Sequence, residues 1–136
     1  MAKAHTGRCA CGKVRYEFSG ETVKMANCHC EDCRRASGSG YAPLLFVPKS
    51  SVRLSGEVRY YGVTSEGGTL VERGFCPNCG SQVLIRLAKD PANLAIQAGS
   101  LDDPSLHRPA ANVWTKNRPA WDQLDPAIPH YAIRPS

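Results

Sequence analysis

The sequence predicts an all-β domain of short antiparallel strands with one short helical turn. The chain of 136 residues contains 12 glycines and 10 prolines, and these separate short runs rich in β-branched and aromatic residues. The runs have the length of strands rather than of buried helices, and just one segment has a helical pattern. The length fits a single domain over residues 1–136, with an ordered core over about 5–131 and loose termini.

Seven strands are expected along the chain. In Lys13–Phe18, alternation places Val14, Tyr16 and Phe18 on one face. Turn residues bound the other six runs, which are Tyr41–Val47, Glu57–Val63, Thr69–Phe75, Ser81–Leu87, Asn93–Gly99 and Ala111–Thr115. Pro43 lies inside the first of these six, and because proline donates no ladder hydrogen bond, we expect that strand at a sheet edge or at a bulge.

The expected helix is Glu31–Ser37. Its first turn is acidic, which the helix dipole favours, and Gly38 supplies a stop. A helix of one or two turns is not stable alone, so another contact must hold it in place. The proline-rich C-terminal third carries Trp114, Trp121 and Tyr131, whose rings need burial, and we therefore expect it to be ordered and to wrap the sheet.

Composition argues against two classes of partner. No apolar run approaches the roughly 18 residues of a membrane span, and the N-terminus lacks the apolar region of a secretory signal, so we expect a cytoplasmic protein with no membrane partner. The formal charge is +5, but the basic residues are scattered apart from Arg34 and Arg35, and we expect no nucleic-acid partner. The sequence does not predict the oligomeric state.

Four cysteines form two closely spaced pairs, Cys9 with Cys11 and Cys76 with Cys79. In a reducing compartment such spacings indicate metal more often than disulfides. On an extended strand Cys9 and Cys11 would face the same side, and the segment CPNCG is typical of a zinc knuckle. Together the four thiolates make a closed tetrahedral set of the kind that structural zinc uses. The alternatives are iron and, for CPNCG alone, a redox dithiol.

The other three cysteines lie at the expected junction of strand and helix. Cys28 and Cys30 are spaced to share a strand face, and Cys30 and Cys33 to share a helix face, so the three sulfurs should converge on one ion. By the same alternation His29 faces away, which makes it a poor ligand and favours a surface or supporting role. Three protein ligands are typical of catalytic zinc, whose fourth position takes water or substrate. The alternative is a distant fourth ligand, and spacing does not rank the candidates His107, His130, Asp102, Asp103, Asp122 and Asp125.

The chain resembles the glutathione-dependent formaldehyde-activating enzyme (GFA) family over nearly its whole length. The segments that carry the resemblance are Gly7–Gly20, Asn27–Pro43, Arg73–Val83, Ala98–Pro104 and Val113–Tyr131. The series C-x-C, C-x-C-x-x-C and C-x-x-C, in this order, is far more specific than any single pair. Many relatives have a histidine where this chain has Asn112, a difference that bears on substrate identity.

The resemblance implies a β-tent of stacked antiparallel sheets with two zinc ions. One is a structural zinc on Cys9, Cys11, Cys76 and Cys79, and the other a catalytic-type zinc on Cys28, Cys30 and Cys33. It also implies a carbon–sulfur lyase activity, the formation of S-hydroxymethylglutathione, with glutathione and formaldehyde as the small-molecule partners. Arg34 and Arg35 are candidate contacts for the carboxylates of glutathione, or else solvated helix charges. The rival functions are a non-catalytic zinc-stabilised binding module and a thiol sensor.

Overall fold

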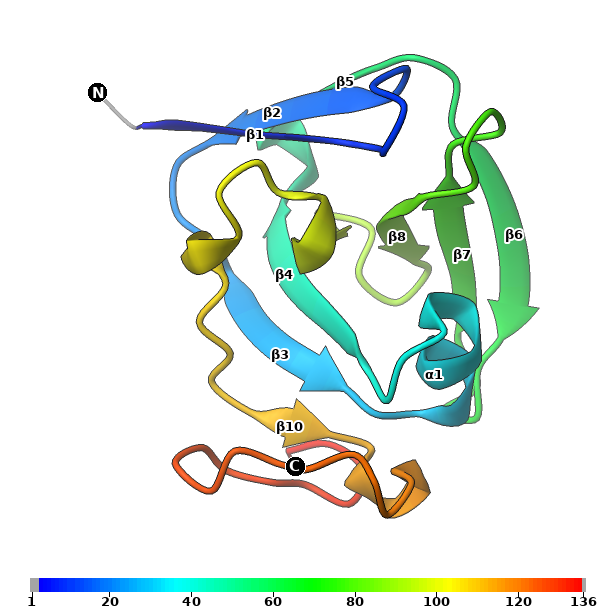
Figure 1. Ribbon diagram of the computed structural model, residues 1–136, viewed down its shortest axis with the longest axis vertical. Coiled ribbons are helices and arrows are strands. Elements are labelled where there is room, and N and C mark those ends of the chain that lie inside the picture. Colours follow the sequence, from blue (N-terminus) through cyan, green and yellow to red (C-terminus); the bar gives the residue numbers. More distant parts are fainter. Residues whose placement is uncertain (1–2, 136) are drawn as a thin grey trace.

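The protein is described here by a computed structural model over residues 3–135, in which the strands form two sheets (Figure 1). The small sheet has the antiparallel order β1-β2-β5, with bounds Ala4–Arg8, Arg15–Ser19 and Val52–Ser55. The large sheet has the order β10-β3-β4-β9-β8-β7-β6. Its strands in chain order are β3 Lys24–Cys28, β4 Ala42–Pro48, β6 Arg59–Thr64, β7 Leu70–Phe75, β8 Gln82–Leu87, β9 Asn93–Gln97 and β10 Asn112–Val113.

All strand pairs are antiparallel except β10 with β3, which is parallel. The one α-helix, α1, is Glu31–Ser37 and follows β3 directly. Four 3-10 turns complete the described residues: η1 Lys49–Ser51, η2 Ala98–Ser100, η3 Pro104–Leu106 and η4 Thr115–Asn117. The predicted all-β class with one short helix is therefore confirmed. Within residues 3–135, no helix has the length and apolarity needed to cross a membrane.

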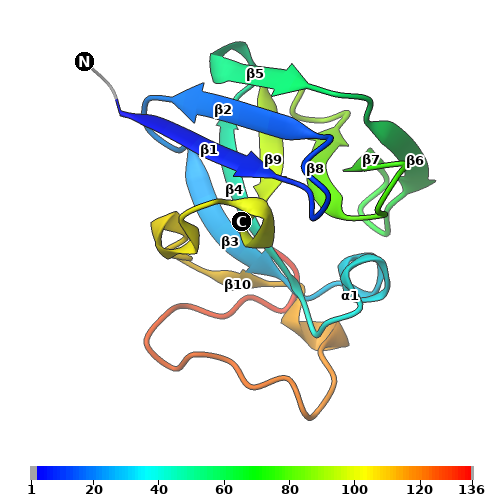
Figure 2. The same ribbon diagram turned by 45° about the horizontal axis from the view of Figure 1, so that its top comes forward.

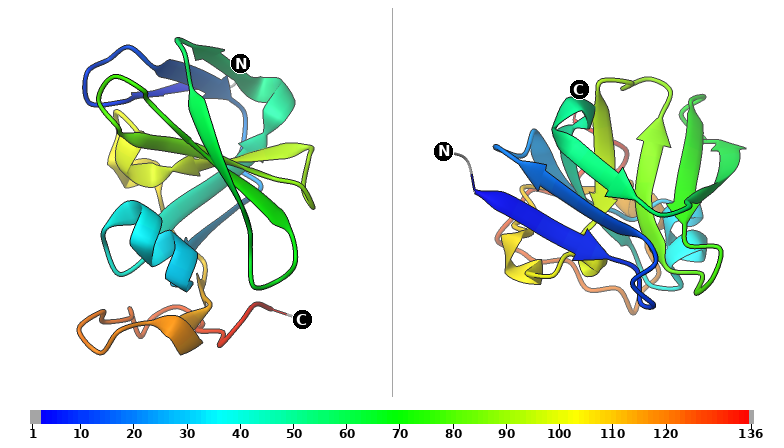
Figure 3. Two further views of the ribbon diagram at one scale, coloured as in Figure 1. Left: turned by 90° about the vertical axis from the view of Figure 1, so that its right-hand side faces the viewer. Right: turned by 90° about the horizontal axis from the view of Figure 1, so that it is seen from above.

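The small sheet lies across one face of the large sheet, and the main core fills the space between them (Figures 2 and 3). Leu45 and Val47 of β4 point into this core, where they pack with Phe18 of β2. Side chains alternate along a strand, so Leu44 faces the opposite side of the large sheet. There it belongs to a second apolar cluster that includes Cys33 of α1. The inner strands of the large sheet are thus buried on both faces.

The expectation for Pro43 is wrong, because β4 is an inner strand between β3 and β9 with an unbroken register. The Asn27 N–H, opposite Pro43 in the ladder, donates instead to the Ala111 carbonyl. Asn27 and Pro43 therefore form a non-hydrogen-bonded pair of the antiparallel ladder, and the Pro43 nitrogen faces β9. Pairing with β9 begins only at Leu44, so the missing N–H of Pro43 breaks no ladder bond.

The C-terminal segment is ordered along the β10 edge of the large sheet (Figure 1). Backbone hydrogen bonds hold it there: Asn112 N–H donates to Pro129, and Tyr131 N–H donates back to Asn112. The predicted burial of Trp121 is wrong, since that residue is 68% exposed. The next side chain, Asp122, faces inward and is buried, which leaves Trp121 directed toward solvent.

Candidate functional site

The first cysteine group joins two turns that are far apart in the sequence. Cys9 and Cys11 lie in the turn between β1 and β2, not on the extended strand that was predicted, and Cys76 and Cys79 lie in the turn between β7 and β8. The four sulfurs are all within 4.8 Å of one another, and Cys11 Sγ is 3.6 Å from Cys9 Sγ and 3.8 Å from Cys76 Sγ. Tetrahedral ligands about 2.3 Å from zinc lie about 3.8 Å apart, so this donor set fits a tetrahedral ion.

Both turns use glycine in a backbone conformation that other residues adopt at a cost. Gly12 and Gly80 have φ of 80° and 79°, in the left-handed region, and their N–H groups donate to the carbonyls of Cys9 and Cys76. Hydrogen bonds from the side chain and the backbone of Ser81 lower the pKa of Cys79 to about 5. The lowered pKa favours the thiolate, the form that binds metal.

The second group converges from the junction of β3 and α1. Cys28 is the last residue of β3, Cys30 is the N-cap of α1, and Cys33 lies in the first part of the helix. Their sulfurs are all within 4.8 Å of one another. Cys30 Sγ accepts from the Cys33 N–H at 3.3 Å, so the same sulfur also caps the helix. Hydrogen bonds from the Cys28 and Cys33 thiols, with that N–H, lower the pKa of Cys30 to about 2.

A buried arginine from β7 lies beside the second group. Arg73 is 6% exposed, and its Nη2 donates to Cys33 Sγ at 3.4 Å. Its Nε is buried and has no hydrogen-bond partner among residues 3–135. The sequence reasoning missed Arg73, although alternation places it on the same inward face as Val71, where a charged residue is unusual. The guanidinium supplies positive charge where the three sulfurs meet.

His29 lies at the junction but takes no part in either cysteine group. The predicted supporting role is compatible with its contacts, but a surface position is not, because His29 is 1% exposed. Its Nδ1 donates to Asp122 Oδ2 at 2.5 Å, and its Nε2 is 2.9 Å from Asn112 Oδ1. Tyr41 packs against the ring at 4.9 Å between centroids. Asn112 therefore contacts the junction through His29.

No histidine or carboxylate of residues 3–135 joins the three-cysteine group. This holds for all six candidate fourth ligands, His107, His130, Asp102, Asp103, Asp122 and Asp125. Three of them make hydrogen bonds in a polar cluster around β3 and β10, which consists of Asn27, His29, His107, Asn112, Asp122 and His130. The Asp122 carboxylate accepts from the His29 ring, His107 Nε2 donates to Asn27 Oδ1 at 3.0 Å, and His130 Nδ1 accepts from Asn112 at 3.2 Å.

The two arginines of α1 follow Cys33 directly. Arg35 Nε donates to Glu31 Oε1 at 3.1 Å, one helical turn away, and both side chains of this pair are largely exposed. Arg34 is half-buried. The structure thus places both arginines on the helix that carries Cys33, and it gives Arg35 a partner within the same helix.

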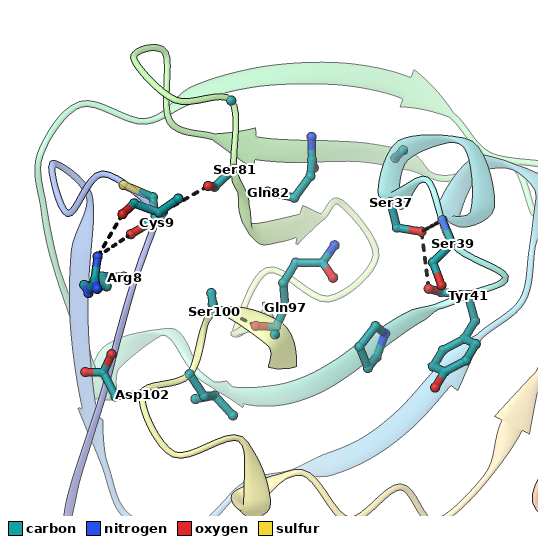
Figure 4. Close-up of a pocket in the computed structure, with 16 residues that line it drawn as sticks. Arg8, Cys9, Ser37, Ser39, Tyr41, Ser81, Gln82, Gln97, Ser100 and Asp102 are labelled. Atoms are coloured by element: carbon teal, nitrogen blue, oxygen red, sulfur yellow. Dashed lines mark hydrogen bonds between the residues drawn. The ribbon is translucent and has the colours of Figure 1, made fainter.

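A large open cavity lies between the first cysteine group and the C-terminal end of α1 (Figure 4). Its volume is about 870 Å³, and Cys9 forms part of its wall. The three cysteines of the second group do not line it, but Ala36 and Ser37 of α1 do. Seven of its sixteen lining residues carry a hydroxyl or an amide, and the charged residues Arg8 and Asp102 line its small-sheet end.

Comparisons with known proteins agree with these features. By structure, the chain is similar to a crystal structure of a Rhodobacter sphaeroides protein that was a Northeast Structural Genomics target, with a TM-score of 0.58 and 18% sequence identity. The alignment covers 92% of this chain and 98% of that chain, and at this identity it shows the fold alone. The family model described as glutathione-dependent formaldehyde-activating enzyme matches residues 4–117, which contain all seven cysteines. The chain therefore belongs to the glutathione-dependent formaldehyde-activating enzyme family.

Proposed function

We propose that this protein is a zinc-dependent carbon–sulfur lyase that forms or cleaves the adduct of a small thiol, such as glutathione, and an aldehyde, such as formaldehyde. The observation that carries the proposal is the group of three converging cysteines, which no fourth protein ligand among residues 3–135 completes. Sites of this kind leave one coordination position for a reactant. The family description, which names glutathione and formaldehyde, supports this choice of substrates.

Two zinc ions per chain are part of the proposal. Cys9, Cys11, Cys76 and Cys79 would hold a closed structural ion, and Cys28, Cys30 and Cys33 a second ion with an open position. The sulfur distances and the lowered pKa of Cys79 support the first assignment. When bound at the second site, zinc supplies two effects, namely stabilisation of a thiolate and polarisation of an aldehyde oxygen.

The reaction adds a thiol S–H across a carbonyl. The sulfur forms a bond to the aldehyde carbon, and the proton that leaves the sulfur ends on the former carbonyl oxygen. The chain brings the two reactants together at one point, which removes the entropy cost of their encounter. Arg73 contributes a buried positive charge 3.4 Å from Cys33 Sγ, and this charge favours an anionic thiolate at the same place.

The polar cluster behind the junction holds the ligands in position. His29 lies between two of the ligands in sequence, and its ring is fixed on both sides by Asp122 and Asn112. Because the ring is buried, movement of the junction would break hydrogen bonds that water cannot replace. Arg34 and Arg35 stay candidate contacts for the substrate carboxylates, and Arg35 would exchange its Glu31 partner for one of them.

Metal analysis with X-ray absorption spectroscopy tests the proposal. We expect two zinc ions per chain, one with four sulfur ligands and one with three sulfurs and a lighter atom. Glutathione should convert the second signal to four sulfurs, and the purified protein should accelerate adduct formation above the spontaneous background. A second ion already closed by a protein ligand, with no acceleration, would contradict the proposal and favour a zinc-stabilised binding module. Loss of the second ion on peroxide treatment, again with no acceleration, would favour the thiol sensor.

A further inference from the structure

We propose that the β6 edge of the large sheet is the interface of a homodimer, in which β6 of one copy pairs antiparallel with β6 of a second copy. β6 is the last strand of the large sheet, and no other described element lies on its outer side (Figures 1 and 2). The opposite edge strand, β10, is instead covered by the C-terminal segment, whose Tyr131 N–H donates to the Asn112 carbonyl. A strand edge with free backbone groups is a template for another strand.

The backbone of every second residue of β6 points away from the sheet. The Ser65 N–H donates to the Thr69 carbonyl, and this bond fixes the pattern of the β6–β7 ladder. Because hydrogen-bonded and non-hydrogen-bonded pairs alternate in an antiparallel ladder, the odd-numbered residues of β6 bond to β7. The N–H and C=O groups of Tyr60, Gly62 and Thr64 therefore face outward. Among the described residues, none of these three has a backbone hydrogen bond outside the sheet.

β6 has few of the features that protect an edge strand from pairing. Its sequence, RYYGVT, contains no proline and no lysine, and its register with β7 has no bulge. Tyr61 is 68% exposed on one face of the sheet, and Leu70 of β7 is 45% exposed on the other. Leu70 leans over Gly62, since its Cδ1 lies 3.3 Å from the position that a Gly62 Cβ would take. Exposed apolar side chains thus lie on both faces of the free edge.

The edge is self-complementary when a two-fold axis passes between the Gly62 residues of two copies. Gly62 then pairs with Gly62 of the second copy, and Tyr60 pairs with Thr64 of the second copy, so all the outward-facing groups of β6 exchange hydrogen bonds. Between these pairs, Tyr61 lies opposite Val63 of the second copy, at the non-hydrogen-bonded positions where side chains approach most closely. Aromatic and β-branched side chains stabilise a ladder when they lie opposite each other.

The charges at the ends of this ladder are complementary as well. The register brings the Glu57–Arg59 ion pair of one copy to the tip of the β6–β7 hairpin of the second copy. That tip carries the exposed Glu66, and its Gly67 carbonyl accepts a hydrogen bond from Lys89 Nζ at 3.0 Å. Each end therefore joins charges of both signs, and the Arg59 side chains of the two copies lie at opposite ends. Backbone, apolar side chains and charge thus all fit a second copy of this chain.

Sedimentation velocity and amide hydrogen exchange of the full chain test this interface. We expect the wild type to sediment as a dimer at high concentration and to dissociate on dilution. The amides of Tyr60, Gly62 and Thr64 should exchange about tenfold or more slowly in the dimer than in the dilute monomer, because only the second copy gives them a partner. The amides of Tyr61 and Val63, which bond to β7, should be protected in both states.

Tyr61→Lys should weaken dimerisation about tenfold or more, because it places a charge in the interface of each copy. Trp121→Lys is the matched control, since Trp121 has the same exposed fraction of 68% but lies on the C-terminal segment at the opposite edge, and it should leave dimerisation unchanged. If Tyr61→Lys fails to fold, Gly62→Pro decides: it removes an outward N–H that the monomer does not use, and edge strands tolerate proline.

Three results would overturn the proposal. A wild type that stays monomeric up to about 1 mM would leave the edge to a strand of another protein. A dimer whose Gly62 amide exchanges as fast as in the monomer would be formed by another surface. The same conclusion would follow if Tyr61→Lys and Trp121→Lys weakened dimerisation equally, or if folded Gly62→Pro still dimerised like the wild type.

Discussion

Replacement of Asp122 should weaken the three-cysteine metal site more than the four-cysteine site. Asp122 belongs to the C-terminal segment, and it accepts a hydrogen bond from His29, 93 residues away, at 2.5 Å. The exposed fractions of the two side chains are 4% and 1%. His29 lies directly between Cys28 and Cys30 in the sequence. If its ring can move, the backbone that carries both ligands can move as well.

The magnitude follows from the burial of the pair. Removal of one partner leaves a buried polar group unsatisfied, at a cost of about 1–3 kcal/mol, or about 3–5 kcal/mol if the pair is ionised. Asp122→Ala should therefore lower the free energy of unfolding by about 3 kcal/mol, and Asp122→Asn, which keeps an acceptor, by less. Loss of a residue that hydrogen-bonds a metal ligand typically lowers metal affinity about 10–100-fold, and Asp122 acts one step further away, through His29 between two ligands. We therefore expect a loss at the lower end of this range, about tenfold, at the second site.

The assay is zinc release to a chromophoric chelator from protein loaded with metal. Wild type should release zinc in two phases, and Asp122→Ala should speed only the phase assigned to Cys28, Cys30 and Cys33. Asp125→Asn is the matched control, because this carboxylate lies on the same segment but is exposed. Equal acceleration of both phases would mean that the variant merely unfolds the domain. Unchanged release of both ions would refute the idea that His29 and Asp122 position the junction.

Three further predictions concern the core and the two cysteine groups. Gly7→Ala should cost about 1–3 kcal/mol in urea unfolding, because the new Cβ overlaps the Tyr16 ring, whereas Gly99→Ala, with open space, should be near neutral. Burial raises the pKa of Tyr16 to about 12. The protonated phenol therefore stabilises the fold fully below about pH 10, and the free energy of unfolding should fall by about 3 kcal/mol as the pH rises through about 12. Tyr16→Phe should remove this pH dependence. Cys76→Ser should lower the thermal midpoint strongly, while Cys30→Ser should spare the fold and abolish activity; equal unfolding by both variants would contradict the division into structural and catalytic sites.

Local sequence patterns predicted much of the fold because each acts over a few residues. The boundaries expected for α1 match the structure, since the acidic first turn and Gly38 act within the helix itself. β1 and β5 were not predicted, and only the end of β3 at Cys28 was expected. β5 has three exposed residues out of four, and the one buried residue of β1 is Gly7, so neither strand shows a strong apolar pattern. Their strand conformation depends on pairing with β2, which is a long-range property.

The sequence predicted which cysteines come together better than it predicted which other residues contact them. Spacing brings the sulfurs of each C-x-C or C-x-x-C unit together whether the unit lies on a strand or in a turn. Cys9 and Cys11 therefore meet although their predicted strand is a turn. The contacts of Arg73 with Cys33, 40 residues apart, and of Asp122 with His29 depend on tertiary packing. Alternation along β7 marks Arg73 as inward-facing but does not identify Cys33 as its partner, and no pattern in the sequence pairs Asp122 with His29.

The positions of the two cysteine groups explain why they should differ in their effect on stability. Cys9 and Cys76 are 1% exposed and belong to the main core between the two sheets. Cys28 and Cys30 are half-buried and pack against the second cluster, on the opposite face of the large sheet. Loss of a ligand from the first group therefore opens the core that joins the sheets. Loss of a ligand from the second disturbs a short helix and one strand end, and leaves the contact between the sheets intact.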